Sequence, residues 1–451
     1  MTDDRGPAAA GPPQPASSPG TQEPGRTSAS SEGADDERAR GIDADANAAE
    51  MSRARVVVAV ATAAVLAVAL VVVTLIVLRQ YRSAPAPQQS AAASPTAPGT
   101  ITADGILQSF NRAFLMQSNG SGYYRLTTAG DVVSFFKQVE LIEMTEDAYL
   151  RSRNPAYKAM IGTLFKGLIA HHGYDWLKNP SNDDLMWATI ACLRAYHITG
   201  DRAYLSQARQ TFDRTYARSW DSTLGGGLWN TTRRLDKNTC VNSPAVIAAC
   251  MLYQSVHHRS YLVTATKLYH WLRARLYDRA TGAVYDHVAH SPSGSGGSSG
   301  SGGSGRGVVD QTSFTYNQGG FIGAADAMRR VTKDRRRRYY VDALKALAYT
   351  RANLTVGGIL RSEISDGRNI WASAGGFKGM FVRWASIFIR DSHVRGYGAW
   401  FRRNVAAVRN HVNAAGLMNE DWPAQTGTGT LTAFSCSSAV VLLQWYPPPA
   451  H

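Results

Sequence analysis

Two adjacent carboxylates, Asp183 and Asp184, stand where a polar stretch gives way to a long apolar run, NDDLMWATIACLRAY from Asn182 to Tyr196. Such a pair suits either of two tasks. Asn and Asp are preferred at the N-terminal cap of a helix, and acids in the first turn complement the helix dipole. Two neighbouring carboxylates can also form a catalytic pair. On these residues alone the capping interpretation is favoured, so the rest of the chain has to decide.

Aromatic residues divide the 451-residue chain into two parts. Residues 1–80 contain no Phe, Trp or Tyr, and all 10 Trp lie from Trp176 onward. Only the second part can build a large core. The first 50 residues carry 10 Asp and Glu against 4 Arg and are rich in Ala, Gly, Pro and Ser. We therefore expect residues 1–54 to be a disordered tail.

An apolar run from Val56 to Leu78 follows the tail, 23 residues without a charge. At ~1.5 Å per residue it would span roughly 35 Å, enough to cross a bilayer. A cleaved signal peptide fits less well, because its apolar core is shorter and stands nearer the start of the chain. We predict a retained transmembrane helix over residues 55–79. Arginines flank both of its ends, so charge does not fix the orientation; a single-pass protein of the cell membrane with an extracellular domain is preferred on function.

Residues 80–100 have the Pro, Ala and Ser composition of a linker, and the folded domain is predicted over residues 101–446. Without the first 84 residues, which hold 8 Arg and 10 acids, 40 basic and 24 acidic residues remain, a net charge of about +16. A basic domain tethered to a membrane would favour anionic envelope polymers or lipid headgroups. The alternative is that a large soluble domain is simply basic, without a specific polyanion partner. The run Arg335–Arg338 resembles a solvated face more than a nucleic-acid motif, and we expect no nucleic-acid partner.

The four cysteines have no zinc-type spacing, so we expect no metal site, and we expect no cofactor. In an exported domain Cys192, Cys240, Cys250 and Cys436 allow three pairings and one or two disulfides.

Apolar residues recur at helical spacing almost throughout the domain, without sustained period-two alternation, which predicts an all-α fold. A weak repeat supports it: Tyr157, Tyr204, Tyr261 and Tyr340 each stand near the start of an amphipathic helix. The last interval is lengthened by the insertion 291–307, in which 15 of 17 residues are Gly or Ser. More uniformly apolar helices precede the last three amphipathic ones, and such helices are buried on all sides.

Alternating buried and amphipathic helices predict an (α/α)6 barrel, a toroid of paired inner and outer helices. The segments that lead into inner helices should then meet at one mouth of the ring. Polar and aromatic residues crowd in five of them, and aromatic rings beside amide and carboxylate groups suit a sugar ligand. These segments are residues 182–187, 225–230, 236–244, 314–320 and 375–384.

With these segments in order, residues 101–446 resemble glycoside hydrolase family 76, the endo-α-1,6-mannanases and their fungal cell-wall relatives. The matching blocks are the aspartate pair with Trp187, GGGLWN, DKNTCVNSP, VYDHV, FTYNQGGFIGA and FKGMFVRW. The resemblance implies an (α/α)6 barrel and retaining hydrolysis of α-1,6-mannosidic bonds. By the same resemblance Asp183 is the nucleophile and Asp184 the general acid/base.

Ten residues are the candidate site. Besides Asp183 and Asp184, we expect three aromatic rings to stack on sugar and five polar side chains to bind mannose hydroxyls, although a structural role is an equal alternative for each of these eight. The aromatic candidates are Trp187, Trp229 and Tyr316, and the polar ones are Asn238, Asn242, Asn317, Gln318 and Lys378.

The leading hypothesis is a membrane-anchored glycoside hydrolase that cleaves α-1,6-mannosidic bonds in mannan-type polysaccharide or lipoglycan. The alternatives are a cell-envelope transglycosylase that remodels mannose-containing glycans and a non-catalytic carbohydrate-binding barrel. A lyase or isomerase on the same toroid is also compatible with the fold, since fold does not imply function.

Overall fold

The computed structural model describes residues 101–290, 307–363 and 374–447. In these ranges the chain forms twelve α-helices and eight short strands. The predicted tail 1–54, membrane helix 55–79 and linker 80–100, and nearly all of the insertion 291–307, lie outside the described residues. Within the described ranges, no helix combines the length and apolar character needed to cross a bilayer.

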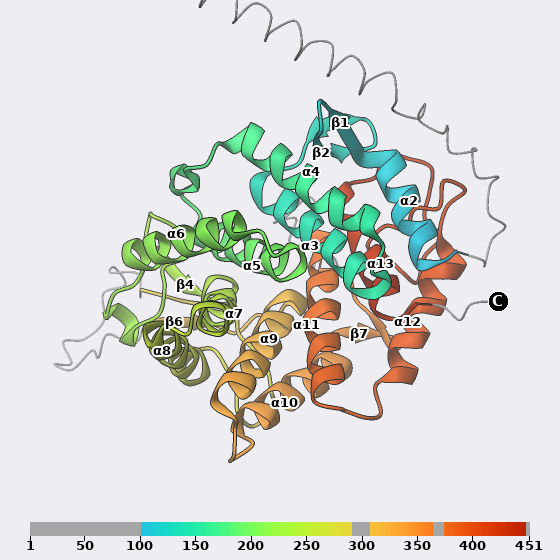
Figure 1. Cartoon of the computed structure of the whole chain (residues 1–451). Coiled ribbons are helices and arrows are strands. Elements are labelled where there is room, and N and C mark those ends of the chain that lie inside the picture. Colours follow the sequence, from blue (N-terminus) through green and yellow to red (C-terminus); the bar gives the residue numbers. More distant parts are fainter. Residues whose placement is uncertain (1–100, 291–306, 364–373, 448–451) are drawn as a thin grey trace, which may run out of the picture. The chain divides into compact units, whose positions relative to one another are not determined.

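Six helices form a closed ring in which each packs against the next, and the last packs against the first (Figure 1). These inner helices are α3 (Phe135–Ser152), α5 (Asn182–Thr199), α7 (Thr239–Val256), α9 (Thr315–Thr332), α11 (Phe377–Asp391) and α13 (Ala433–Trp445).

The other six helices alternate with the inner ones along the chain and cover the ring from outside. They are α2 (Ala103–Phe114), α4 (Pro155–His172), α6 (Arg202–Ser219), α8 (Arg259–Arg275), α10 (Arg338–Asn353) and α12 (Gly398–His411). The barrel is therefore confirmed. The four tyrosines of the predicted repeat fall in the outer helices α4, α6, α8 and α10, as expected.

Burial explains which helices are inner and which are outer. The inner helix α13 buries every residue from Ala433 to Gln444, whereas α6 buries one stripe at helical spacing. Local signals set the boundary between α5 and α6. Gly200 ends α5 in the left-handed conformation (φ 78°), and the Asp201 carboxylate caps α6 by accepting from the Ala203 N–H at 2.9 Å.

Because each inner helix is followed by an outer helix that returns along it, all six inner helices begin at the same end of the barrel. We call this end the mouth and the opposite end, where the inner helices finish, the rear. The mouth receives the five polar and aromatic segments, since they lie at the starts of α5, α7, α9 and α11 or in the loop before α7. Their predicted convergence is confirmed.

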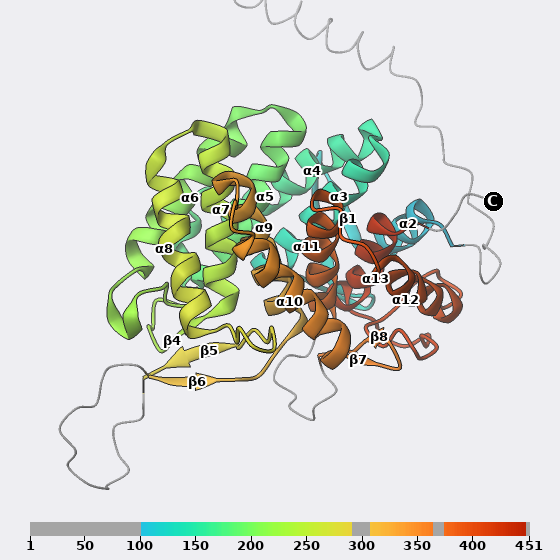
Figure 2. The ribbon, with the colours of Figure 1, turned by 90° about the horizontal axis from the view of Figure 1, so that it is seen from below.

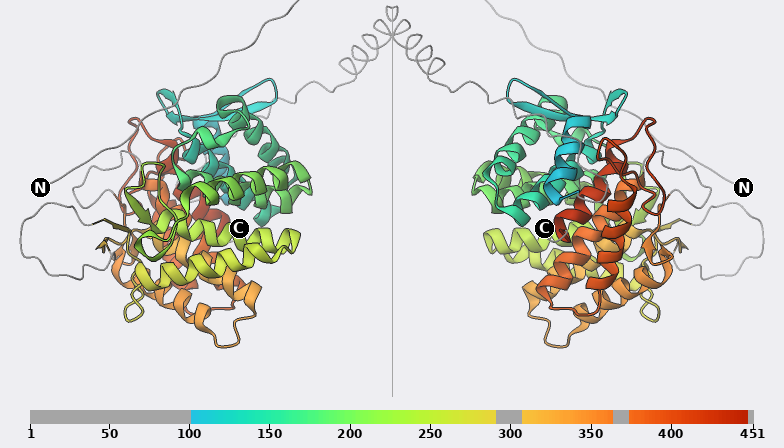
Figure 3. Two further views of the ribbon diagram at one scale, coloured as in Figure 1. Left: turned by 90° about the vertical axis from the view of Figure 1, so that its left-hand side faces the viewer. Right: turned by 90° about the vertical axis from the view of Figure 1, so that its right-hand side faces the viewer.

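Three small antiparallel sheets accompany the helices of the barrel. Strands β1 (Leu115–Ser118), β2 (Ser121–Thr127) and β3 (Gly130–Val132) form one sheet at the edge of the barrel (Figure 3). Asn119 and Gly120 turn β1 into β2 with positive φ at both positions. Asn-Gly is a strong hairpin signal, but the strands are too short for alternation to be sustained.

The second and third sheets lie along one edge of the helical ring (Figure 2). The second joins β4 (Asp236–Asn238), β5 (His287–Ala289) and β6 (Val308–Asp310), and the third joins β7 (Thr355–Val356) to β8 (Ile359–Leu360). The Gly/Ser insertion thus connects two neighbouring antiparallel strands, β5 and β6, and β4 leads directly into inner helix α7.

The four cysteines are buried and unpaired, so the disulfides considered from the sequence are absent from the described residues. Cys192, Cys240, Cys250 and Cys436 all lie in inner helices, where they act as small apolar side chains.

A buried cluster of ion pairs joins three inner helices. Arg194 of α5 binds Glu143 at 2.5 Å and Asp147 at 2.6 Å, both on α3. Arg383 of α11 binds Glu140 at 2.7 Å and the second oxygen of Asp147 at 2.8 Å. The Arg383 side chain is 1% exposed, so its charge is compensated by buried acids and not by water.

We expect Arg383→Met to lower the free energy of unfolding by about 3–5 kcal/mol, because it leaves buried carboxylates without their counter-charge. Urea unfolding of the purified chain measures the loss. The control is Arg390→Met on the same helix, whose side chain is 61% exposed and forms an ion pair with Asp391. The control should change stability by less than ~0.5 kcal/mol. Equal losses in the two variants would contradict a structural role for the cluster.

Candidate active site at the mouth of the barrel

The two aspartates occupy the first turn of α5, both partly exposed. Ser181 is the N-cap residue, but its hydroxyl caps no helix N–H. It donates to Asp183 Oδ1 and, at 3.0 Å, to Asp184 Oδ1. Only one first-turn N–H is bound by the pair, that of Asp184 itself, which donates to Asp183 Oδ1 at 2.8 Å. The carboxylates therefore do little capping and remain available for chemistry.

Asp184 is the more perturbed carboxyl. Burial, and next the charge of Asp183, raises its pKa to about 7, although hydrogen bonds from Asn179 and Ser181 oppose the shift. Asn179 Nδ2 lies 2.9 Å from Asp184 Oδ2. A carboxyl with a pKa near 7 is about half protonated at neutral pH, which is the property a general acid needs.

Asn182 fixes the start of α5 against the loop before α7. Its backbone N–H donates to the Asn230 carbonyl and its Nδ2 to the Trp229 carbonyl, each at 2.8 Å. Its Oδ1 accepts from Arg218 Nε at 2.7 Å. Arg218 also donates to the carbonyls of Leu177 and Asn179, and so ties the segment before the aspartate pair to α6.

Lys237 organises the loop that contains GGGLWN. Its side chain is fully buried, and its Nζ lies 2.7 Å from Asp221 Oδ1 and 2.9 Å from the Gly226 carbonyl. Nζ also lies 4.6 Å from the centre of the Trp229 ring. Burial alone would raise the pKa of Asp221, but hydrogen bonds led by that from Lys237 lower it to about 2. This ion pair stabilises the loop together with its buried apolar residues Leu224 and Leu228.

A second acidic group, absent from the sequence predictions, adjoins the pair. Asp286 Oδ1 accepts from Asn317 Nδ2 at 2.8 Å, and its Oδ2 lies 2.9 Å from His287 Nδ1. The bond to Asp286 is the largest cause of the raised pKa of His287. Burial raises the pKa of Asp236, and the charges of Asp286 and Asp183 add to this. The VYDHV block contained the signal, since it places an acid and a histidine at the start of a mouth strand.

Tyr316 lies beside this group. Burial raises the pKa of its hydroxyl, and the charges of Cys240, Asp286 and Asp183 contribute. Its ring is half-buried, and its centre lies 4.1 Å from that of Phe377 at the start of α11. Asn317 Oδ1 and Asn238 Oδ1 are buried without a hydrogen-bond partner among the described residues. These two amide oxygens can accept hydrogen bonds from a ligand.

Three other predicted binding residues hold backbone instead. Asn242 exchanges hydrogen bonds with Leu228, at 2.8 Å to its N–H and 3.1 Å to its carbonyl. Gln318, with its amide oriented to satisfy both groups, bonds the segment from Gly282 to Val284. Lys378 is buried and donates to the carbonyls of Glu420 and Leu360.

The two predicted tryptophans also have little open surface. Trp187 is 1% exposed, and its ring centre lies 6.5 Å from that of Trp384. Trp229 is 3% exposed and donates from Nε1 to Asp221 Oδ2 at 2.6 Å. Trp187 is thus placed in the barrel core and Trp229 in the loop that Lys237 organises, because neither ring has a free face for a sugar.

Within the described ranges, no group of three or more His, Cys, Asp or Glu side chains has the arrangement of a metal site.

The helical ring with paired carboxylates at its mouth is the architecture of a glycoside hydrolase. The sequence model of glycosyl hydrolase family 76 matches residues 100–441, and the chain belongs to this family. No curated protein matches the chain.

Solved structures support the assignment. The GH76A α-1,6-mannanase of Salegentibacter sp. HEL1_6 is 26% identical, with a TM-score of 0.67 over 76% of this chain and 97% of its own. Inactive variants of that enzyme, with two consecutive aspartates replaced by Asn or by Ala, are solved with α-1,6-mannotriose and α-1,6-mannotetrose. The Lin0763 protein of Listeria innocua is 25% identical, with a TM-score of 0.67 over 76% of this chain and 95% of its own.

We expect Ser181→Ala to raise the pKa of Asp184 further, because it removes a hydrogen bond that stabilises the charged carboxylate. The titration can be followed by difference infrared spectroscopy of the carboxyl bands, with Asp184→Asn to identify the signal. The control is Ser222→Ala, which changes an exposed serine of the loop before α7. A titration that does not move in Ser181→Ala would contradict the hydrogen-bond assignment.

Proposed function

We propose that the chain is a membrane-anchored endo-hydrolase of α-1,6-mannan or mannan-bearing lipoglycan. The observation that carries the proposal is the consecutive pair Asp183 and Asp184 at the mouth of a family 76 barrel, one of them with a pKa near 7. The inactive variants of the Salegentibacter mannanase change consecutive aspartates too, and that enzyme holds α-1,6-mannooligosaccharides. The apolar run from Val56 to Leu78 supports the anchor.

The geometry supports a retaining mechanism. One hydroxyl, that of Ser181, bonds both carboxylates. Because the Ser181 oxygen lies within hydrogen-bond distance of an oxygen from each carboxylate, these two oxygens are at most ~6 Å apart. Retaining glycosidases need carboxyls about 5–5.5 Å apart, whereas inverting ones leave more room for a water molecule.

The two carboxyls would act in sequence. Asp183 attacks the anomeric carbon and forms a glycosyl ester, while the bond to the leaving oxygen breaks and Asp184 gives that oxygen its proton. Asp184 then removes a proton from water, which attacks the same carbon and releases Asp183. Asn238, Asn317 and Tyr316 are the groups that we propose to contact the sugar, because they combine free acceptors with a partly exposed ring.

Asp183→Asn and Asp184→Asn should each lower the hydrolysis of linear α-1,6-mannan at least ~100-fold, because one removes the nucleophile and the other the general acid. Release of reducing ends measures the rate. The control, Asp201→Asn, changes a true helix N-cap carboxylate in α6, and Asn caps equally well. The control should keep full activity. Wild-type rates in Asp183→Asn would refute the assignment.

Azide separates the two roles. With an activated aryl α-mannoside and added azide, Asp184→Asn should regain turnover and give the α-azide, because the covalent intermediate still forms. Asp183→Asn should give only the inverted β-azide, because azide then attacks the substrate directly. If Asp183→Asn gave the α-azide and Asp184→Asn the β-azide, then Asp184 would be the nucleophile and Asp183 the general acid. Products lengthened by an added acceptor sugar would indicate transglycosylation, and mannan affinity without turnover would indicate a binding barrel.

The pH dependence follows from the Asp184 proton. The first step needs the protonated acid, so kcat/KM should decrease about tenfold per pH unit above the pKa of about 7. The profile is measured on α-1,6-mannan and compared with that of Ser181→Ala, whose alkaline limb should lie at higher pH. Wild-type kcat/KM that stays constant well above pH 7 would exclude Asp184 as the general acid.

A further inference from the structure

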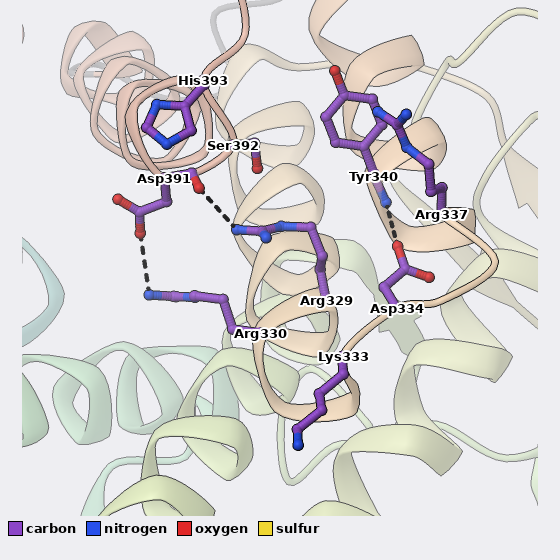
Figure 4. Close-up of a pocket in the computed structure, with 9 residues that line it drawn as sticks. All are labelled: Arg329, Arg330, Lys333, Asp334, Arg337, Tyr340, Asp391, Ser392 and His393. Atoms are coloured by element: carbon purple, nitrogen blue, oxygen red, sulfur yellow. Dashed lines mark hydrogen bonds and ion pairs between the residues drawn. The ribbon is translucent and has the colours of Figure 1, made fainter.

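A basic pocket lies at the rear of the barrel, at the opposite end from the aspartate pair. Its volume is about 580 Å³. It is formed where α9 and α11 end and α10 begins, with the side chains shown in Figure 4. The lining residues are Arg329, Arg330, Lys333, Asp334, Arg337, Tyr340, Asp391, Ser392 and His393.

The pocket holds more cations than its own acids neutralise. Arg329 and Arg330 share the buried Asp326, at 2.8 and 3.3 Å, and Arg330 also lies 3.4 Å from Asp391 (Figure 4). Lys333 is exposed and has no ion pair among the described residues. The lining holds four Lys or Arg against two Asp, a net charge of +2.

The position of these cations is not explained by helix stability. Basic residues at the C-terminal end of α9 complement its dipole, but Arg335 to Arg338 lead into the N-terminal end of α10, where the dipole repels positive charge. Arg337 is the N-cap residue of α10, in the left-handed conformation (φ 52°), and its side chain caps no N–H. Arg337 is exposed, and its guanidinium lies over the Tyr340 ring, 4.4 Å from the ring centre.

The described domain also begins at the rear. The carbonyl of Ala103, at the start of α2, accepts from Gln444 at the end of α13 at 2.7 Å. Asp104 accepts from Tyr157 at the start of α4 at 2.6 Å. The chain therefore enters the barrel at the same end that carries the basic pocket, only 21 residues (80–100) after the predicted membrane helix.

From this coincidence we infer that the rear pocket binds the phosphate groups of anionic lipids in the membrane that holds the chain, and thereby turns the mouth away from the bilayer. The inference rests on the anchor in the proposed function. A connection of only 21 residues keeps the rear close to the headgroups, at an effective concentration of about millimolar for a short linker. Weak contacts from Arg330, Lys333 and Arg337 then suffice to select one orientation.

The test uses the full chain in nanodiscs of phosphatidylcholine alone or mixed with phosphatidylglycerol. Hydrogen exchange of residues 329–338 and 391–393 should be several-fold slower with phosphatidylglycerol. The difference should disappear in the triple variant Arg330→Gln, Lys333→Gln, Arg337→Gln. The control replaces three exposed basic residues of α2, β2 and α4, Arg112, Arg125 and Lys166, by Gln and should keep the difference.

Equal exchange in the two membranes, or protection that survives the triple variant, would overturn the inference. Protection by inorganic phosphate in neutral nanodiscs, equal to that by phosphatidylglycerol, would instead identify a site for a soluble anion. Association with neutral nanodiscs tests the anchor by itself. The triple variant should hydrolyse soluble α-1,6-mannan at the wild-type rate. If the wild-type chain itself does not hydrolyse this mannan, the proposed enzymatic function fails, whatever the result of the exchange experiment.

Discussion

The inner ring depends on one buried set of charges: two guanidinium groups from α5 and α11 against four acids of α3. Arg194 and Arg383 cannot balance four ionised carboxylates. Burial, and next the charge of Glu143, raises the pKa of Glu140 to about 8, and burial raises that of Glu146. With these two acids protonated, the remaining two balance the arginines. The folded state then holds a proton on Glu140 that the unfolded chain releases above its ordinary value of 4.5. This stabilisation is complete below that pH and is lost as pH rises through about 8.

Such a cluster specifies which helices meet more than it adds stability, because an apolar replacement of similar volume often stabilises as well. In this protein the cluster fixes the position of α5, the helix that carries the two aspartates. Arg194 holds α5 some eleven residues, roughly 16 Å, beyond Asp183. Asn182 holds the same helix at its first turn through the Trp229 and Asn230 carbonyls. A helix fixed at both points cannot slide or rotate, so the directions of its two carboxylates are determined before a ligand arrives.

The sequence predicted the barrel well because its signals are local and repeated. The apolar residues recur at helical spacing because one face of each outer helix, and all faces of each inner helix, are buried. The role of an amide is harder to predict, since an amide has the same appearance in sequence whether it binds a ligand or a backbone carbonyl. Asn242 and Gln318 turned out to hold loops, whereas Asn238 and Asn317 keep a free oxygen. Asp286 was missed because its approach to Asp183 depends on pairing between β4 and β5, which are separated by 48 residues of chain.

The parallel direction of the inner helices gives the barrel two electrically different ends. Six helix N-termini at the mouth place partial positive charge beside Asp183, Asp184 and Asp286. This favours ionised carboxylates, and Asp184 nevertheless has a raised pKa, so burial and the neighbouring Asp183 outweigh the dipole there. Six C-termini at the rear favour cations, which accounts for Arg329 and Arg330. It does not account for the arginines that open α10, because an outer helix runs in the opposite direction and presents its positive end to them. Helix dipoles thus account for the cations at the end of α9, whereas the arginines that open α10 are placed against the dipole of their own helix.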